Sequence, residues 1–454
     1  MKTEPETRSP EETVIRRILG EWRSAGISCL ALRGYERLPQ QVGNDLDVLV
    51  AQDDCRKIER LLLGVTSEHD LRRFMRVERS AGYLVSHRFY DRISSWNLAV
   101  DIWTGLTWKG IPFLATEAVL ARRTRADLID IPRPAHEAAA SLFGKALHGS
   151  WVQEDRRERI RELVQSDEAE FRRVGELAFG ARRTEALLER VRRLELAPDS
   201  DETRRLRVAL VARAGSRRPL SVVTGLVREL PRMFERARRP TGVFIVLLGP
   251  DGSGKSSIGG PLTDRLTDRL GSDGALHFHW KPFRAFAPRD PGPVSSPHAR
   301  PVRSGIASRA YLLLHWFEFL LGSWLTIQPR LIRGIPVIGE RYFLDVWLDP
   351  IRYRLDLGSW TGVPSLLGVR KPDIVLCLVA TPETLQRRKT EVPLAATTQQ
   401  LNALKTFAGA DSSARVIDVD RRFEDVLASC ESAVLQCLAQ RDSVRDARTR
   451  RRSS

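Results

Sequence analysis

The segment Gly249-Pro-Asp-Gly-Ser-Gly-Lys-Ser256 constrains the fold of this chain more than any other part of the sequence. It directly follows the apolar run 243–248 and fits the pattern G-x-x-x-x-G-K-[ST] at each fixed position. There a buried strand leads through a glycine-rich turn into a helix, whose first backbone N–H groups face phosphate oxygens. The lysine reaches the β- and γ-phosphates, and the next hydroxyl can bind Mg²⁺. The predicted nucleotide-binding residues are Gly249, Gly252, Ser253, Gly254, Lys255, Ser256 and Ser257, with Ser256 as a Mg²⁺ ligand.

Residues 240–440 alternate short apolar runs with helical patterns. The apolar runs lie at 243–248, 335–339, 373–379 and 415–419. Runs that are apolar throughout and rich in β-branched residues are typical of parallel strands covered on both faces. The region is therefore predicted to be an α/β domain with a parallel sheet. The alternative, a glycine-rich turn with a chance lysine, disagrees with this strand–loop–helix context.

Four motifs of this region resemble the thymidylate kinase family of nucleoside-monophosphate kinases. They are the P-loop with its acidic Asp251, the strand end Glu340-Arg341-Tyr342, the run Thr381-Pro-Glu-Thr-Leu-Gln-Arg-Arg-Lys389, and Val416-Ile-Asp418 before a final helix. The resemblance implies a P-loop kinase that uses ATP and Mg²⁺. It places Asp251, Glu340 and Arg341 at the acceptor site, and the basic residues Arg387 and Arg388 over the phosphates.

Two further segments resemble a divergent bacterial subgroup of thymidylate kinase-like proteins. These are Pro297-His298-Ala-Arg300 and the stretch from Asp345 to Arg354, which contains Arg352. The resemblance adds His298, Arg300 and Arg352 to the acceptor residues. The sequence departs from true thymidylate kinases at Glu340, where aspartate is usual, and residues 278–303 do not align with the thymidine-recognising residues. The acceptor is therefore left as nucleotide or sugar-like.

Phosphoryl transfer depends on in-line positioning and on cations at the equatorial oxygens. The candidate catalytic residues are Lys255, Asp251, Arg341, Arg387 and Arg388. Two structural alternatives stay open. The run 387–389 could be a solvated helix face. The Glu340-Arg341 pair could be a structural ion pair.

The first 135 residues carry a second group of candidate residues. Asp45 and Asp47 lie two apart in the predicted strand 45–50, so their side chains share one face. Asp101, in the predicted strand 98–103, could add a third carboxylate. Three such carboxylates suit a two-metal site for nucleotidyl transfer, so all three are candidate Mg²⁺ ligands. The alternative is a pair of exposed acids at a strand end.

The segments Gly43-Asn-Asp-Leu-Asp-Val-Leu-Val50 and Leu30-Ala-Leu-Arg-Gly34 resemble the nucleotidyltransferase superfamily. The resemblance implies an α/β fold for this region. That family usually has Gly-Ser or Gly-Gly after its first strand, whereas Tyr35 follows Gly34 here. Transferase activity is therefore left open.

The predicted organisation is an α/β multidomain chain. It comprises a nucleotidyltransferase-like α/β domain (1–135), a helical connecting region (136–239), a P-loop parallel-sheet kinase-like domain (240–440) and a basic disordered tail (441–454). The chain has a formal net charge of +16. Because its arginines mostly alternate with acidic residues on helical faces, they are expected to be solvated. No specific nucleic-acid partner is expected.

The apolar segment 310–327 contains His315 and Glu318, which favour a buried or acceptor-site helix over a membrane span. Peripheral membrane contact through its aromatic residues stays open. The five cysteines are scattered without metal-ligand spacing, and the first residues are polar, so a cytoplasmic protein with reduced thiols is expected. A homodimer is also expected.

The sequence predicts an ATP- and Mg²⁺-dependent kinase that acts on a small-molecule acceptor. One alternative is a bifunctional enzyme that phosphorylates a sugar or nucleoside and then activates it with a nucleotidyl group. The other is a nucleotide-dependent protein that binds nucleic acid or a membrane surface.

Overall fold

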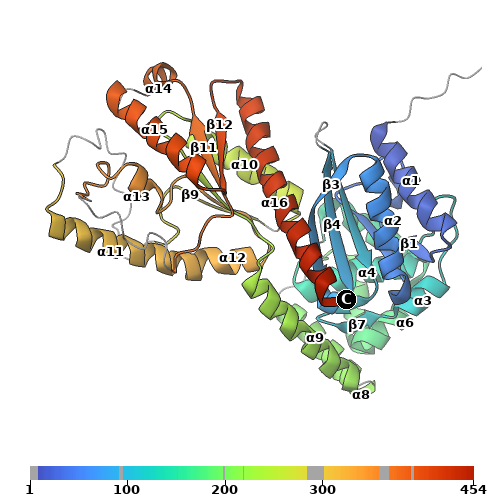
Figure 1. The fold of residues 1–454 in the computed structure, drawn as a ribbon. Helices are drawn as coiled ribbons and strands as arrows, with labels where there is room; N and C mark the ends of the chain where they lie inside the picture. The colour runs from blue at the N-terminus through green and yellow to red at the C-terminus, as the bar shows by residue number, and fades with distance from the viewer. Residues whose placement is uncertain are drawn as a thin grey trace, which may run out of the picture. The chain divides into compact units, whose positions relative to one another are not determined.

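The structure is a computed structural model that describes residues 9–91, 96–150, 152–197, 200–217, 219–272, 274–283, 301–356, 368–389 and 393–453. The chain divides into two compact units, Met1–Phe234 and Glu235–Ser454 (Figure 1). Each unit contains its own five-stranded sheet, and each is described by itself.

The first unit is built on a mixed sheet with the strand order β1-β2-β5-β4-β3. The strands are β1 (Cys29–Ala31), β2 (Leu46–Val50), β3 (Leu71–Arg79), β4 (Leu84–Asp91) and β5 (Asn97–Trp103). β2 runs parallel to β5, while the other neighbouring pairs are antiparallel. The register of the parallel pair sets Asp47 beside Asp101. A separate hairpin joins β6 (Leu106–Trp108) to β7 (Ile111–Leu114).

One face of this sheet is covered by α1 (Pro10–Ser24) and α2 (Cys55–Glu68). The start of α1 agrees with its sequence, because Ser9 Oγ accepts a hydrogen bond from the backbone N–H of Glu12 at 3.1 Å. Trp22 and Leu62, which are fully buried, pack with the sheet residue Val100 in the core under this face.

The other face carries the helices of the middle region. These are α4 (Pro134–His148), α5 (Glu154–Ser166), α6 (Glu168–Phe179), α7 (Ala181–Arg192) and α8 (Ser200–Arg217). Phe143, Phe171 and Phe179 pack together and share a core with the strand residues Leu30 and Leu49. The helical middle therefore forms one unit with the N-terminal sheet. The remaining elements are α3 (Thr116–Ala121), α9 (Pro219–Arg238) and the short turns η1 (Tyr35–Arg37), η2 (Gln52–Asp54) and η3 (Ser80–Gly82).

The second unit contains the parallel sheet that the sequence predicts, with the strand order β12-β11-β8-β10-β9. The strands are β8 (Phe244–Leu248), β9 (Leu276–Phe278), β10 (Val337–Gly339), β11 (Ile374–Val379) and β12 (Ala414–Asp418). β8 comes first in the chain but lies in the middle of the sheet, between β10 and β11. In open α/β sheets ligands bind at the carboxyl end of the strands, where the connections change sides. The loop after β8 lies at this position.

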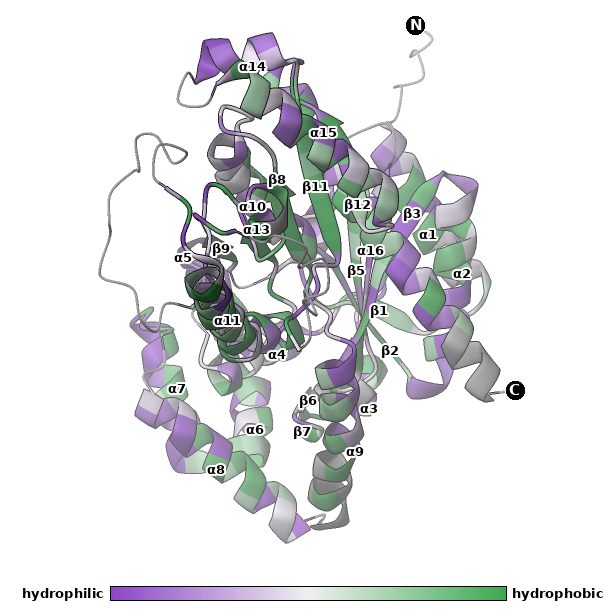
Figure 2. Cartoon of the chain, turned by 60° about the vertical axis from the view of Figure 1, so that its left-hand side comes forward, coloured by the Kyte–Doolittle hydropathy of each residue, from purple (hydrophilic) through white to green (hydrophobic). Residues whose placement is uncertain are grey.

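Helices cover both faces of the second sheet. They are α10 (Lys255–Leu270), α11 (Gly305–Gly322), the π-helical turn η4 (Ser323–Ile327), α12 (Gln328–Ile332), α13 (Asp345–Leu348), α14 (Pro382–Arg388), α15 (Leu394–Ala410) and α16 (Phe423–Ser453). Phe244 and Val246 of β8 share a core with Leu312 and Phe319 of α11. α10 and α16 pack on each other and on the strands. Figure 2 shows β11 as hydrophobic along its length, as expected for a strand covered on both faces.

The segment 441–454 differs from its prediction, because α16 continues to Ser453 instead of ending in a disordered tail. Contacts with the start of the unit explain the difference. The guanidinium of Arg441 donates to the backbone oxygen of Thr241 at 2.9 Å, and that of Arg445 donates to the backbone oxygen of Pro240 at 2.8 Å. These hydrogen bonds attach the first part of the segment to the start of the unit.

The apolar helix has one buried face and one exposed face. Among the described residues, one helix, Gly305–Ile332, is long and apolar enough to cross a membrane, and 39% of its most apolar window is buried. Leu312 and Phe319 are buried in the core, whereas Leu313, Phe317 and Trp324 are exposed. The buried face agrees with the prediction of a helix that belongs to the kinase-like part.

Candidate functional site

The loop between β8 and α10 has the tight backbone of a phosphate-binding turn. Gly252 and Gly254 both have a φ of +83°, a conformation that L side chains rarely adopt. A Cβ on Gly249 would lie 2.6 Å from Ser253 Oγ and 2.8 Å from the backbone oxygen of Leu378. Glycine is thus required at these points. The predicted nucleotide-binding residues 249–257 form this turn and the first turn of α10.

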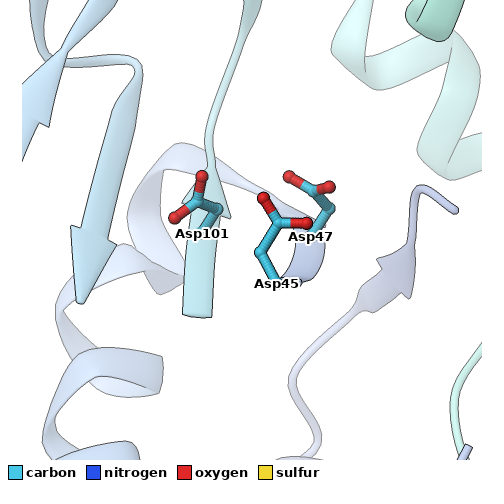
Figure 3. A group of neighbouring side chains, drawn as sticks. All are labelled: Asp45, Asp47 and Asp101. Atoms are coloured by element: carbon cyan, nitrogen blue, oxygen red, sulfur yellow. The ribbon is translucent and has the colours of Figure 1, made fainter. Parts of the chain in front are cut away.

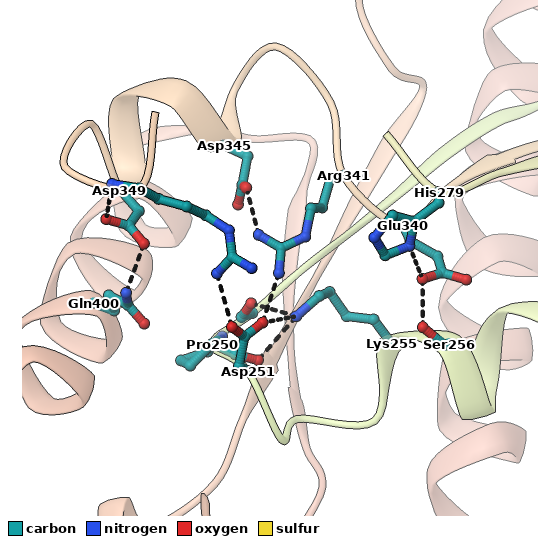
Figure 4. Close-up of polar contacts among 12 residues, drawn as sticks. Pro250, Asp251, Lys255, Ser256, His279, Glu340, Arg341, Asp345, Asp349 and Gln400 are labelled. Atoms are coloured by element: carbon teal, nitrogen blue, oxygen red, sulfur yellow. Dashed lines mark hydrogen bonds and ion pairs between the residues drawn. The ribbon is translucent and has the colours of Figure 1, made fainter. Parts of the chain in front are cut away.

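Lys255 is buried and folds back onto the loop (Figure 4). Its Nζ donates hydrogen bonds to the backbone oxygens of Gly249 (2.7 Å) and Pro250 (2.9 Å), and it lies 4.0 Å from Asp251 Oδ1. Burial, followed by the charge of Arg341, lowers the pKa of Lys255 to about 7, although Asp251 acts in the opposite direction. A phosphate would offer this ammonium group anionic oxygens in place of neutral carbonyl oxygens.

Ser256 and Glu340 join the start of α10 to the end of β10. Ser256 Oγ donates to Glu340 Oε2 at 2.5 Å, and the same carboxylate accepts from His279 Nδ1 at 2.7 Å and lies 3.1 Å from His277 Nε2. Burial would raise the pKa of Glu340, but hydrogen bonds from His277, His279 and Ser256 hold it well below its ordinary value.

A hydroxyl beside an ionised carboxylate is a donor set that suits Mg²⁺, which prefers oxygen ligands and keeps several waters. Ser256 and Glu340 would hold the ion, which supplies positive charge to the phosphates. Glu340, which the sequence predicts at the acceptor site, therefore lies beside the predicted metal ligand.

Asp251 lies at the centre of an ion-pair network next to Lys255 (Figure 4). Its Oδ1 accepts from Arg341 Nη2 at 2.6 Å, and its Oδ2 accepts from Arg352 Nη1 at 2.8 Å. Arg341 also donates through Nη1 to Asp345 Oδ2 at 2.8 Å. Burial would raise the pKa of Asp251, but Arg341 and Arg352 hold it well below its usual range. The structure thus brings together three residues that the sequence predicts separately.

The C-terminal end of α14 packs against the phosphate loop. A Cβ on Gly252 would lie 3.0 Å from the backbone oxygen of Leu385 and 3.5 Å from Arg388 Cβ. Arg387 and Arg388 are exposed. Arg387 Nη2 donates to Thr384 Oγ1 at 3.3 Å, and Arg388 Nη2 donates to the backbone oxygen of Val419 at 3.1 Å. The backbone of α14 therefore brings Arg388 close to the loop, but these hydrogen bonds of the two arginines go to Thr384 and Val419 and not to the loop.

Two predicted acceptor residues, His298 and Arg300, lie outside the described residues.

In the first unit, Asp45, Asp47 and Asp101 converge (Figure 3). One ligand oxygen from each lies within 4.8 Å of the others. Asp47 is buried, with 1% of its surface exposed. Burial raises the pKa of Asp47 to about 6; the charges of Asp45 and Asp101 act in the same direction, and the charge of Arg33 acts in the opposite direction. Three carboxylates at this spacing have the donor chemistry of a divalent metal site.

Two arginines already neutralise part of this acid cluster. Arg33 Nε donates to Asp47 Oδ2 at 2.5 Å, and its Nη2 lies 3.8 Å from Asp45 Oδ2. Arg88 Nη1 donates to Asp101 Oδ1 at 2.7 Å. A metal ion would have to displace Arg33 to reach both Asp45 and Asp47.

Sequence reasoning did not assign several residues that line or support these sites. Asp345 follows Arg341 by four positions, a spacing that could have indicated their ion pair. His277 and His279 reach Glu340 because β9 and β10 are neighbouring strands. Gln400 Nε2 donates to Asp349 Oδ2 at 2.8 Å across a long sequence separation, and no local pattern points to this contact.

Comparisons with known proteins find similarity to this chain among solved structures but not among family models or curated proteins. No family model matches it, and no curated protein matches it. Among solved structures, the thymidylate kinase from Ehrlichia chaffeensis is similar, with 18% sequence identity and a TM-score of 0.29. The match covers 43% of this chain and 100% of that chain. Values this low decide no fold by themselves. The parallel sheet and the phosphate loop fit a P-loop kinase-like part.

Proposed function

We propose that the second unit is an ATP- and Mg²⁺-dependent phosphotransferase that phosphorylates a small molecule. The proposal is supported above all by the buried Lys255, which closes on its own loop beside a pocket that contains Asp251 and Arg341. A phosphate-binding lysine next to a pocket with convergent polar groups is the arrangement that phosphoryl transfer needs.

The residues have distinct roles in this proposal. The loop N–H groups and Lys255 hold the β- and γ-phosphates, because they are the positive groups at the start of α10. Arg341, which donates to Asp251, is near enough to stabilise charge on the transferred group. Asp251 faces the pocket and orients the acceptor hydroxyl.

The test is to incubate the full chain with Mg²⁺-ATP and a pool of nucleosides, nucleotides and sugars, and to follow the products by phosphorus NMR. We expect ADP and a new phosphomonoester or diphosphate with the natural chain. Lys255→Met should lose both products, whereas Lys371→Met, at an exposed lysine, should keep them. Equal turnover by the natural chain and Lys255→Met would refute the proposal.

We propose nucleotidyl transfer by the first unit as a second candidate function. The observation that favours it is the convergence of Asp45, Asp47 and Asp101. In two-metal sites such carboxylates hold ions that bind both the attacking and the leaving oxygens. This activity would release pyrophosphate, and Asp47→Asn should abolish the release without affecting ADP formation by the second unit. Pyrophosphate release that persists in Asp47→Asn would refute it.

A further inference from the structure

A small pocket of about 20 Å³ adjoins the phosphate loop, and its polar lining indicates which groups of an acceptor can be bound there. The lining comes from the loop itself, the end of β10, α13 with the turn that follows it, and α15 (Figure 4). Its charged and amide side chains are Asp251, Arg341, Asp345, Asp349, Arg352 and Gln400. Three carboxylates face two guanidinium groups, so these lining residues carry a net negative charge.

Both arginines of the pocket are already paired with its carboxylates. Arg341 donates from one terminal nitrogen to Asp251 and from the other to Asp345, and its side chain is 8% exposed. Arg352 donates through Nη1 to the second oxygen of Asp251. A phosphate monoester that used both guanidinium groups would compete with Asp251, which already accepts from Nη2 of Arg341 and Nη1 of Arg352. Asp251 would then lie beside a second negative group, which is unfavourable.

Hydroxyl groups can bind in the pocket without competing with Asp251 for the two arginines. Each carboxylate oxygen has two lone pairs, so Asp251 and Asp349 can each accept from a hydroxyl while keeping their present partners. Asp349 accepts from Gln400 at 2.8 Å and from the backbone N–H of Arg352 at 3.2 Å. Arg352 is the more accessible arginine, with a side chain 21% exposed, and a guanidinium has five N–H donors to offer.

We infer that the acceptor is an uncharged polyhydroxylated molecule, such as a free sugar, a cyclitol or a nucleoside, and not a phosphate monoester. The inference rests on the proposed kinase function and names the substrate class of that same site. In the reaction, the acceptor hydroxyl oxygen forms a bond to the γ-phosphorus of ATP. The bond from the γ-phosphorus to the β–γ bridging oxygen breaks, ADP leaves with that electron pair, and the hydroxyl proton passes to solvent. Asp251 orients this hydroxyl.

The first experiment compares matched acceptors. The full chain, with Mg²⁺-ATP, is given a panel of sugars, cyclitols and nucleosides, and in parallel the monophosphates of the same compounds, with ADP release as the readout. We expect turnover above the acceptor-free rate only with unphosphorylated compounds. Turnover of a monophosphate in preference to its unphosphorylated counterpart would overturn the inference.

The second experiment tests the charge of the pocket without relying on turnover. Isothermal titration calorimetry measures orthophosphate binding to the full chain saturated with Mg²⁺-ADP. We expect the Asp251→Asn variant, which removes the carboxylate that Arg341 and Arg352 share, to bind orthophosphate more than about tenfold more tightly than the natural chain. Asp349→Asn, which leaves both arginines paired with Asp251, is expected to increase the affinity less. Circular dichroism confirms that the variants fold.

The outcomes separate the two proposals. If Lys255→Met hydrolyses and binds ATP as well as the natural chain, the kinase proposal fails, whatever the phosphate titration gives. If the natural chain binds orthophosphate as tightly as Asp251→Asn, the pocket accepts anions and the inference on the acceptor fails, even when the kinase reaction is established.

Discussion

Nucleotide binding is expected to weaken as the pH rises from 6 to 8, because Lys255 loses its proton in the unliganded protein. Burial lowers the pKa of this lysine to about 7. Bound phosphate oxygens restore the charge, so the complex keeps the proton across this range. In the free protein, Lys255 is mostly protonated at pH 6 and mostly neutral at pH 8. Binding at the higher pH must therefore take up a proton.

The size of the effect follows from that pKa. At pH 8, one unit above it, the neutral form exceeds the protonated form by about tenfold, so the apparent Kd should be about tenfold larger than at pH 6. This ratio corresponds to about 1.4 kcal/mol. Below pH 6 the affinity should level off, because Lys255 is then protonated in both states. A lysine with the ordinary pKa of 10.5 would cause no change between these pH values.

Isothermal titration calorimetry with Mg²⁺ and a non-hydrolysable ATP analogue at pH 6, 7 and 8 measures this dependence. Repeating each titration in two buffers of different ionisation enthalpy reports the number of protons taken up. Lys255→Met is the control, since it retains the ionisation of the nucleotide and of the other groups. An identical pH dependence in the natural chain and in Lys255→Met would refute the reasoning, as would binding at pH 8 without proton uptake.

Three further predictions concern backbone space, charge and packing. Gly249→Ala is expected to abolish nucleotide binding in a titration, because its Cβ would overlap the loop. Gly260→Ala should retain binding, because no described atom lies within 4 Å of its Cβ. Equal binding by both variants would contradict the tight turn. Arg33→Ala is expected to bind Mn²⁺ at the aspartate cluster more than about tenfold more tightly in electron paramagnetic resonance titrations, because it removes the competing charge. Unchanged affinity would exclude that competition. Phe319→Ala, at a fully buried ring in an aromatic cluster, is expected to lower the free energy of unfolding by about 3–5 kcal/mol in urea denaturation. The exposed Phe317→Ala should change it by less than about 1 kcal/mol, and similar losses in both would contradict the assigned burial.

Three strands of the second sheet, β8, β10 and β11, could be predicted closely from the sequence because each is apolar throughout, whereas β9 (Leu276–Phe278), which contains His277, was not predicted. The predicted run 243–248 became β8 (Phe244–Leu248), and 373–379 became β11 (Ile374–Val379). β3 (Leu71–Arg79) was not predicted. It is the edge strand of the first sheet, and five of its nine residues are charged, so its apolar pattern is interrupted. β3 is stabilised by its antiparallel pairing with β4, and this pairing cannot be read from the residues of β3 alone.

The tight glycine turn after β8 could be predicted because its pattern is contained in one short segment. The network around Asp251 could not, because its partners Arg341 and Arg352 lie on separate segments, 90 and 101 residues further along the chain. The sequence indicated all three residues but not that one carboxylate holds both arginines. The same limit applies to Arg33, whose position over Asp47 depends on the pairing of β1 with β2.

The central position of β8 has a consequence for how the chain is made. Phe244 pairs with Val337 and Ile245 pairs with Ile374, so neither neighbour of this strand exists when the ribosome releases it. Its five residues are fully buried in the folded protein, but they can be covered only after β10 and β11 have been synthesised. Such non-local closure is slow and leaves an apolar edge open to other chains. A nascent chain that stalls before β11 would therefore be a ready substrate for aggregation and for chaperones that hold exposed apolar segments.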